Sequence, residues 1–244
     1  MPTIDVNGTT LAYDDTGGDG PAVVFSHALY FDRAMFDAQV AAFGRAYRVV
    51  TYDHRGQGAS ARSASVDMDT LTEDAAALIG ALGLAPCHVV GNAMGGFVAL
   101  RLVARRPELL RSAAVLCSSA DEEAAGCNAL PLEALMFGDT TLASRPEVRN
   151  RWQRHFAGLD RSVLPAAEGV LLRKSVLGEL VGARVPLLVL SGDEDNVYGP
   201  DRSQPIADTA ANAHHGVIRH AGNTLPVERP DAVNTHLAAH FAAT

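Results

Sequence analysis

The sequence of 244 residues has little of what secreted, membrane or nucleic-acid-binding proteins need. Its three cysteines, Cys87, Cys117 and Cys127, are scattered without C-x-x-C spacing, which predicts reduced thiols in a cytoplasmic protein. No apolar run approaches the roughly 18–20 residues that span a bilayer, and no signal-peptide pattern is recognisable. The net charge of −8 lacks the surplus of Lys and Arg that nucleic acids and anionic membranes attract. We therefore expect neither nucleic acid nor membrane as a partner.

Hydrophobic residues make up 48% of the chain, which is enough for a large core. Short β-branched runs alternate with helical patterns, which predicts an α/β fold with a mostly parallel central sheet and helices on both faces. Residues 3–6 and 11–13 flank the turn signal Asn7-Gly8 and predict two antiparallel strands at the start. Further strands are expected at 22–26, 47–52, 87–91, 113–117, 186–190 and 217–219, and helices at 33–43, 70–83, 95–105, 201–211 and 230–241, with 70–73 as a capping box.

The pattern changes between residues 121 and 183. Alternating runs disappear, and short helical pieces rich in arginine contain the only tryptophan, Trp152. This segment is too short and too polar to form a core of its own. We interpret 121–183 as a small helical lid over the carboxyl end of the sheet, inserted into a core formed by 1–120 and 184–244.

Residues 89–97, Val-Val-Gly-Asn-Ala-Met-Gly-Gly-Phe, have the form of a nucleophile elbow, Gly-x-Ser-x-Gly, with Ala93 in place of the serine. The central residue of such an elbow has a positive φ, and its neighbours two positions away must be small. Gly91 and Gly95 meet that requirement. An alanine in left-handed geometry costs roughly 1–2 kcal/mol. The segment thus keeps the backbone for a nucleophile and lacks the nucleophile itself.

Together with this elbow, four further segments resemble landmarks of the α/β-hydrolase superfamily, and they follow in the same order along the chain. Within that superfamily the chain is similar to the 3-oxoadipate enol-lactonase-like esterases and lactonases. The resemblance covers essentially the full length and implies an α/β-hydrolase fold. The four segments are Phe-Ser-His-Ala at 25–28, Tyr-Asp-His-Arg-Gly-Gln-Gly at 52–58, Leu-Ser-Gly-Asp-Glu-Asp at 190–195 and Ala-Gly-Asn-Thr-Leu-Pro-Val-Glu-Arg-Pro at 221–230.

The resemblance places the family's nucleophile at Ala93, its general base at Asn223 and its acid at Asp195. It places the two backbone N–H groups of the oxyanion hole at Leu29 and Met94. Acyl transfer by this mechanism needs a hydroxyl that attacks and an imidazole that moves the proton. Alanine and asparagine supply neither. We therefore predict that this chain is not a competent serine hydrolase.

Two explanations for these residues stay open. In one, a hydrolase scaffold has diverged and binds or transforms a small carbonyl-containing molecule without an acyl-enzyme. In the other, an ordinary serine esterase or lactonase is seen as an inactivated Ser→Ala, His→Asn variant. Ala28, which stands where the family has glycine, is a third departure and favours divergence, whereas the intact elbow glycines favour the variant. A third possibility is a small-molecule receptor without catalysis.

Asp195 is the one remaining member of the triad. Without an imidazolium beside it, its carboxyl group should have a raised pKa and can shuttle a proton. The N–H groups of Leu29 and Met94 would then hold an enolate or carbonyl oxygen, which suits lyase, isomerase or cyclase chemistry. The alternative is that Asp195 only caps a loop by accepting backbone hydrogen bonds.

Five further residues are candidates for contact with a substrate: His27, Tyr30, Asn92, Cys117 and Trp152. The ring of His27 has an alternative role in holding its loop, Tyr30 in apolar packing, and Cys117 as a buried inert thiol. Asn92 can orient a ligand but cannot move protons.

We expect no metal and no cofactor. The acidic run at 193–195 has no histidine or second carboxylate motif at ligand spacing. The expected partner is a small-molecule substrate or ligand, and the sequence leaves the oligomeric state open.

Overall fold

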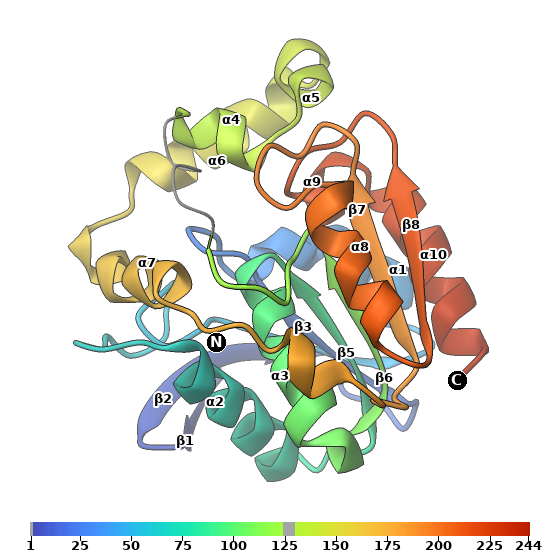
Figure 1. The fold of residues 1–244 in the computed structure, drawn as a ribbon. Coiled ribbons are helices and arrows are strands. Elements are labelled where there is room, and N and C mark those ends of the chain that lie inside the picture. Colours follow the sequence, from blue (N-terminus) through green and yellow to red (C-terminus); the bar gives the residue numbers. More distant parts are fainter. Residues whose placement is uncertain (1, 124–129) are drawn as a thin grey trace.

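The computed structural model describes residues 2–123 and 130–244; Cys127 lies outside them. Its centre is an eight-stranded sheet in the order β1-β2-β4-β3-β5-β6-β7-β8 (Figure 1). β1 pairs antiparallel with β2 and β2 with β4, and all other neighbours are parallel, as the sequence predicts. The strands are β1 Thr3–Val6, β2 Thr9–Asp15, β3 Ala22–Ser26, β4 Arg48–Tyr52, β5 Cys87–Asn92, β6 Leu110–Leu116, β7 Leu187–Gly192 and β8 Ala213–Ile218.

Helices cover both faces of the sheet. The central strands β3, β5 and β7 are buried along their whole length, which is why their sequences are nearly continuous apolar runs. One face carries α2 (Met68–Ala81), α3 (Met94–Arg105) and α8 (Pro200–Thr209), and the other carries α1 (Asp37–Phe43) and α10 (Pro230–Ala242) (Figure 1).

Several boundaries differ from those predicted, and the following three differences have a recognisable physical reason. The helix expected at 33–43 is a 3₁₀ turn, Arg33–Phe36, followed by α1. The capping box at 70–73 does not open α2, because the Asp67 side chain already accepts the Thr70 N–H at 2.7 Å and starts the helix three residues earlier. β8 begins at Ala213 rather than at 217. The prediction placed its start too late because residues 214–215 are polar and do not look like part of a strand, although they pair with β7.

The segment between β6 and β7 contains α4 (Leu132–Met136), α5 (Asp139–Ser144), α6 (Pro146–Ala157) and α7 (Leu164–Leu171). These helices lie beyond the carboxyl ends of the parallel strands (Figure 1). Two 3₁₀ turns flank α7, at Arg161–Val163 and Leu177–Leu180, and further short turns lie at Pro107–Leu109 and in α9 (Leu225–Glu228). Within 2–123 and 130–244, no helix is long and apolar enough to cross a bilayer.

Candidate active site

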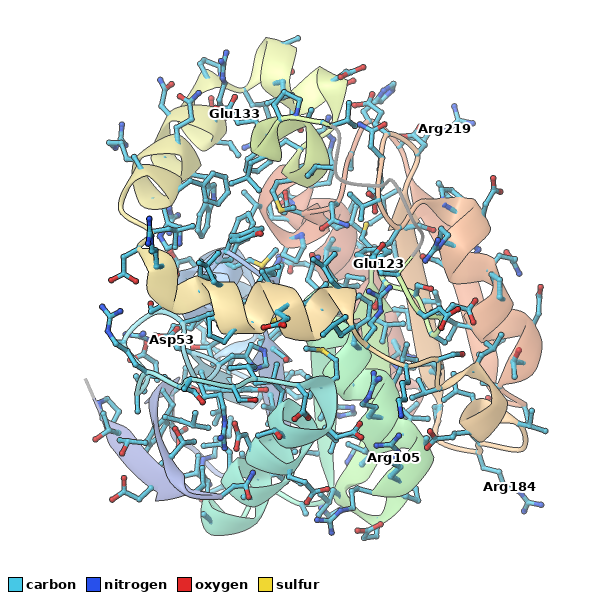
Figure 2. The ribbon with its side chains drawn as sticks, turned by 60° about the vertical axis from the view of Figure 1, so that its left-hand side comes forward. Asp53, Arg105, Glu123, Glu133, Arg184 and Arg219 are labelled. Atoms are coloured by element: carbon cyan, nitrogen blue, oxygen red, sulfur yellow. The ribbon has the colours of Figure 1, made fainter. Side chains whose placement is uncertain are left out.

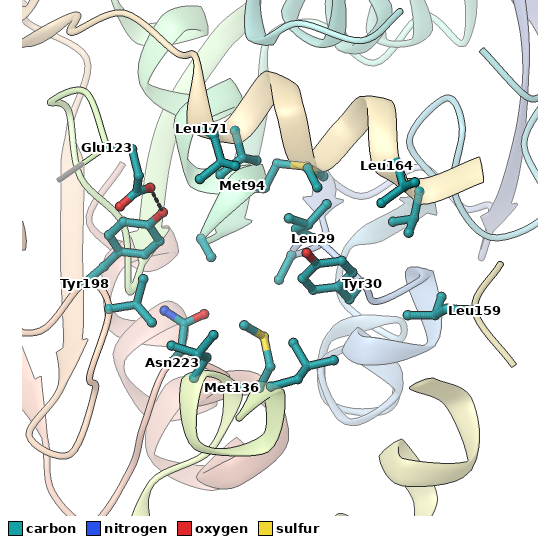
Figure 3. Close-up of a pocket in the computed structure, with 18 of the residues that line it drawn as sticks. Leu29, Tyr30, Met94, Glu123, Met136, Leu159, Leu164, Leu171, Tyr198 and Asn223 are labelled. Atoms are coloured by element: carbon teal, nitrogen blue, oxygen red, sulfur yellow. Dashed lines mark hydrogen bonds between the residues drawn. The ribbon is translucent and has the colours of Figure 1, made fainter. Parts of the chain in front are cut away.

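A cavity of about 790 Å³ lies between the carboxyl ends of the strands and the α4–α7 segment (Figure 3). Most of its wall is apolar, which suits a ligand with a hydrophobic body. Side chains from both sides contribute to this wall, among them Leu29, Met94, Leu132, Met136, Leu164 and Leu171.

Ala93 occupies the turn between β5 and α3, with φ 47° and ψ −109°. The positive φ is the one the elbow pattern predicts. A Cβ at Gly91 would lie 2.1 Å from the Gly95 carbonyl oxygen, and one at Gly95 would lie 1.9 Å from the Ser26 carbonyl oxygen. Strand and helix therefore pass in contact here, and the methyl group of Ala93 faces the cavity.

Two backbone N–H groups are available on the cavity wall. Met94 is the first residue of α3, so its amide has no partner within the helix. Leu29 lies in the loop after β3. Both residues line the cavity, and no acceptor in the described part of the chain takes either N–H. A carbonyl or enolate oxygen of a ligand can accept from such groups.

Asp195 and Asn223 form a hydrogen-bonded pair behind this wall. The Asn223 amide Nδ2 donates to Asp195 Oδ2 at 3.1 Å, while Asp195 Oδ1 accepts from the N–H groups of Val197 and Tyr198 at 2.8 and 3.1 Å. Burial raises the pKa of the Asp195 carboxyl group. Only Asn223 of this pair lines the cavity, so Asp195 acts on the cavity through the asparagine.

Glu228 holds the loop that carries Asn223, a role that sequence reasoning missed. Its side chain is fully buried. Oε1 accepts from the N–H groups of Gly222 and Thr224 at 3.0 and 3.1 Å, and Oε2 accepts from the Gly138 N–H at 2.8 Å. The carboxylate thus connects both sides of Asn223 to the start of α5. Its only sequence signal is its place within the landmark at 221–230.

Four predicted contact residues do not line the cavity, and His27 is the first. Its ring is fully buried, with Nδ1 bonded to the Ala28 carbonyl oxygen at 2.8 Å and Nε2 accepting the His54 N–H at 3.0 Å. This histidine fixes the loop before Leu29. Asn92 is also fully buried and donates to the Asn223 carbonyl oxygen at 2.8 Å, which ties the elbow to the Asn223 loop.

Cys117 and Trp152 also lie outside the cavity wall. The Cys117 thiol donates to the Gly222 carbonyl oxygen at 3.3 Å, and burial raises its pKa well above the ordinary value. Trp152 packs on Phe31, with ring centroids 4.4 Å apart. Tyr30 is the one of the five candidates that lines the cavity, and burial raises the pKa of its hydroxyl.

Glu123 and Tyr198 form a polar end of the cavity beside the C-terminal end of α7 (Figures 2 and 3). Tyr198 donates its hydroxyl to Glu123 Oε2 at 2.6 Å, and Arg173 Nη1 donates to the same oxygen at 2.5 Å. The Arg173 guanidinium also lies 4.0 Å from the centre of the Phe97 ring. Sequence reasoning missed this cluster because its members lie far apart in the chain.

The sheet order and the elbow define a protein of the α/β-hydrolase class. The model of the alpha/beta hydrolase family matches residues 23–236, so the chain belongs to this family. It is 29% identical to the Mycobacterium tuberculosis protein BpoC, named as a non-heme bromoperoxidase, over 96% of this chain and 98% of that protein. It is 42% identical to 3-oxoadipate enol-lactonase 1 of Acinetobacter baylyi, over 39% of this chain and 36% of that protein.

Among solved structures, the enol-lactonase from Burkholderia xenovorans LB400 superposes with a TM-score of 0.89 at 25% identity, covering 99% of this chain and 100% of that one. The superfamily resemblance and the fold are thereby confirmed. The narrower assignment to the enol-lactonase-like branch stays a prediction.

The strained turn leads to a first testable prediction. Replacing Ala93 by glycine should raise the free energy of unfolding by about 0.5–1 kcal/mol, because relief of the left-handed conformation outweighs the entropy that glycine loses on folding. Urea denaturation measures this. Ala99→Gly in the interior of α3 is the matched control and should lose about 1 kcal/mol or more. An equal loss in both variants would contradict the strain at position 93.

Proposed function

We propose that this protein binds a small carbonyl-containing molecule with an apolar body and acts on it without forming an acyl-enzyme. One observation carries the proposal. The N–H groups of Leu29 and Met94 have no acceptor among the described residues, while the elbow contributes only the methyl group of Ala93 to the cavity wall. A ligand carbonyl oxygen can be held there, and nothing at the elbow can attack its carbon.

The other residues of the cavity wall also argue against acyl transfer. Among the described residues, no serine, threonine, cysteine or histidine lines the cavity. Asn223 stands at the position that the resemblance assigns to the general base, and its amide neither takes up nor releases a proton as an acid or base near neutral pH. The part of the wall that the structure describes therefore lacks the hydroxyl or thiol of a Ser, Thr or Cys nucleophile and an imidazole, which ester hydrolysis through a triad requires.

Non-hydrolytic chemistry on a carbonyl compound, of the lyase, isomerase or cyclase type, needs a proton-transfer group on the wall. Asp195 is not on it. Of the two carboxylates that are, Asp160 is exposed and paired with Arg62, whereas Glu123 is held by Tyr198 and Arg173. We therefore assign proton transfer to Glu123 instead of Asp195, with the two backbone amides stabilising the negative charge that develops on oxygen.

The test combines binding with chemistry. We expect 2-decanone to raise the melting temperature of the protein, by roughly 5–10 °C at a concentration 100 times its Kd. Ala167→Trp places an indole in the cavity wall and should abolish the shift. With p-nitrophenyl butyrate, mass spectrometry should detect no acylated protein. A covalent butyryl adduct, or a ketone shift that survives Ala167→Trp, would contradict the proposal.

A further inference from the structure

Asp195 determines which way the Asn223 amide points. Its Oδ1 is occupied by the N–H groups of Val197 and Tyr198, and its Oδ2 faces the Asn223 side chain at 3.1 Å. An ionised carboxylate only accepts hydrogen bonds. Asn223 must therefore turn its NH₂ group toward Asp195 and its carbonyl oxygen the other way.

The Asn223 carbonyl oxygen, Oδ1, belongs to the cavity. Asn223 lines the wall, and Figure 3 shows its oxygen on the side toward the middle of the cavity. No described residue donates a hydrogen bond to it. Because this oxygen is open to the cavity, an apolar ligand that fills the cavity would leave it without a donor, which is costly. A ligand that brings an N–H or O–H group relieves this cost.

This acceptor lies next to the elbow. Asn92 directly precedes Ala93 and donates its side-chain amide to the Asn223 backbone carbonyl at 2.8 Å, which holds the two loops together. The wall of one cavity thus offers two donors, from Leu29 and Met94, and one acceptor, from Asn223. A carbonyl group with an N–H on the neighbouring atom complements this set.

We propose that the cavity selects N-substituted carboxamides over esters of the same shape, and that Asp195 is the positioning residue that sets this preference through Asn223. The inference rests on the proposed function, because it assumes a carbonyl compound held in this cavity. A secondary amide donates its N–H to Asn223 Oδ1, whereas the ester has an oxygen there. Two acceptors then face each other, and the ester binds more weakly.

The experiment compares two probes of equal size, N-methyloctanamide and methyl octanoate, by isothermal titration calorimetry. The wild type should bind the amide roughly 10-fold or more tightly than the ester. In Asp195→Asn, the new amide keeps its oxygen on the Val197 and Tyr198 N–H groups and offers NH₂ to Asn223. The Asn223 amide then turns over, and the preference should vanish or reverse. Asp201→Asn, at an exposed position in α8, makes the same change elsewhere and should keep the wild-type ratio.

Asn223→Leu is the second variant, because it keeps the volume and removes the acceptor. It should bind both probes about equally. This variant tests the role of the Asn223 oxygen even if Asp195→Asn does not fold. Equal binding of the two probes by the wild type would overturn this inference and leave the proposed function standing. Failure of the wild type to bind either probe would overturn the proposed function. Retention of the amide preference in folded Asp195→Asn would overturn the positioning role of Asp195.

Discussion

Ala93→Ser combined with Asn223→His is expected to hydrolyse p-nitrophenyl butyrate about 10³-fold faster than the wild type. The geometry for this gain already exists. Asp195 Oδ2 accepts from the side chain at position 223, so an imidazole there gains the acid partner that orients it. The N–H groups of Leu29 and Met94 are available for the oxyanion, and the turn at position 93 has the φ of a nucleophile elbow.

The gain should require both substitutions and Asp195. Each single variant lacks either the attacking oxygen or the base and should stay within about 10-fold of the wild type, since triad residues act as a unit. Adding Asp195→Ala to the double variant should remove most of the gain. Steady-state kinetics and mass spectrometry of the acyl-enzyme measure these effects. A folded double variant without any gain would contradict the placement of the nucleophile and base at 93 and 223.

The size of the gain also separates the two explanations for this chain. A kcat/KM within the range of ordinary enzymes, about 10⁴–10⁸ M⁻¹s⁻¹, would favour an esterase disabled at two positions. A gain that stops near 10³-fold would favour a cavity shaped for other chemistry, because substrate positioning by the α4–α7 segment contributes as much as the reacting groups do.

The fold was predictable because its signals are local. Apolar runs mark the buried strands, and Gly91 and Gly95 reveal the close approach of strand and helix that the structure contains. The errors fall where tertiary contacts decide. The polar residues at 214–215 conceal the start of an edge strand, and Asp67 replaces the predicted capping box by reaching the Thr70 N–H first.

The candidate site was predictable only in its backbone. The elbow and the oxyanion amides follow from short motifs, and the Asp195–Asn223 pair follows from two landmarks. The cavity wall could not be predicted in the same way, because the α4–α7 segment contributes much of it. Sequence periodicity shows neither where these helices pack nor which of their side chains face the cavity. Trp152, the most conspicuous residue of that segment, packs on Phe31 instead of a ligand.

Glu228 is the clearest example of a residue whose role depends on tertiary contacts that the sequence does not reveal. Its substitution gives the largest expected effect on stability. Glu228→Ala leaves the N–H groups of Gly138, Gly222 and Thr224 buried without an acceptor. Each such donor costs about 1–3 kcal/mol, so we expect a loss of about 3–5 kcal/mol in the free energy of unfolding, measured in urea. Binding of 2-decanone should weaken as well, because the Asn223 loop loses its anchor.

Two variants control this prediction. Glu228→Gln keeps one acceptor oxygen but points its NH₂ group at a backbone donor, so its loss should be about half as large. Glu133→Ala, on α4 (Figure 2), removes a partly exposed carboxylate paired with Arg149 and should change stability by less than about 1 kcal/mol. If Glu228→Ala were no more destabilising than Glu133→Ala, the Asn223 loop would not depend on Glu228. Its position would then have to come from its other hydrogen bonds, among them those to Asn92, Cys117 and Asp195.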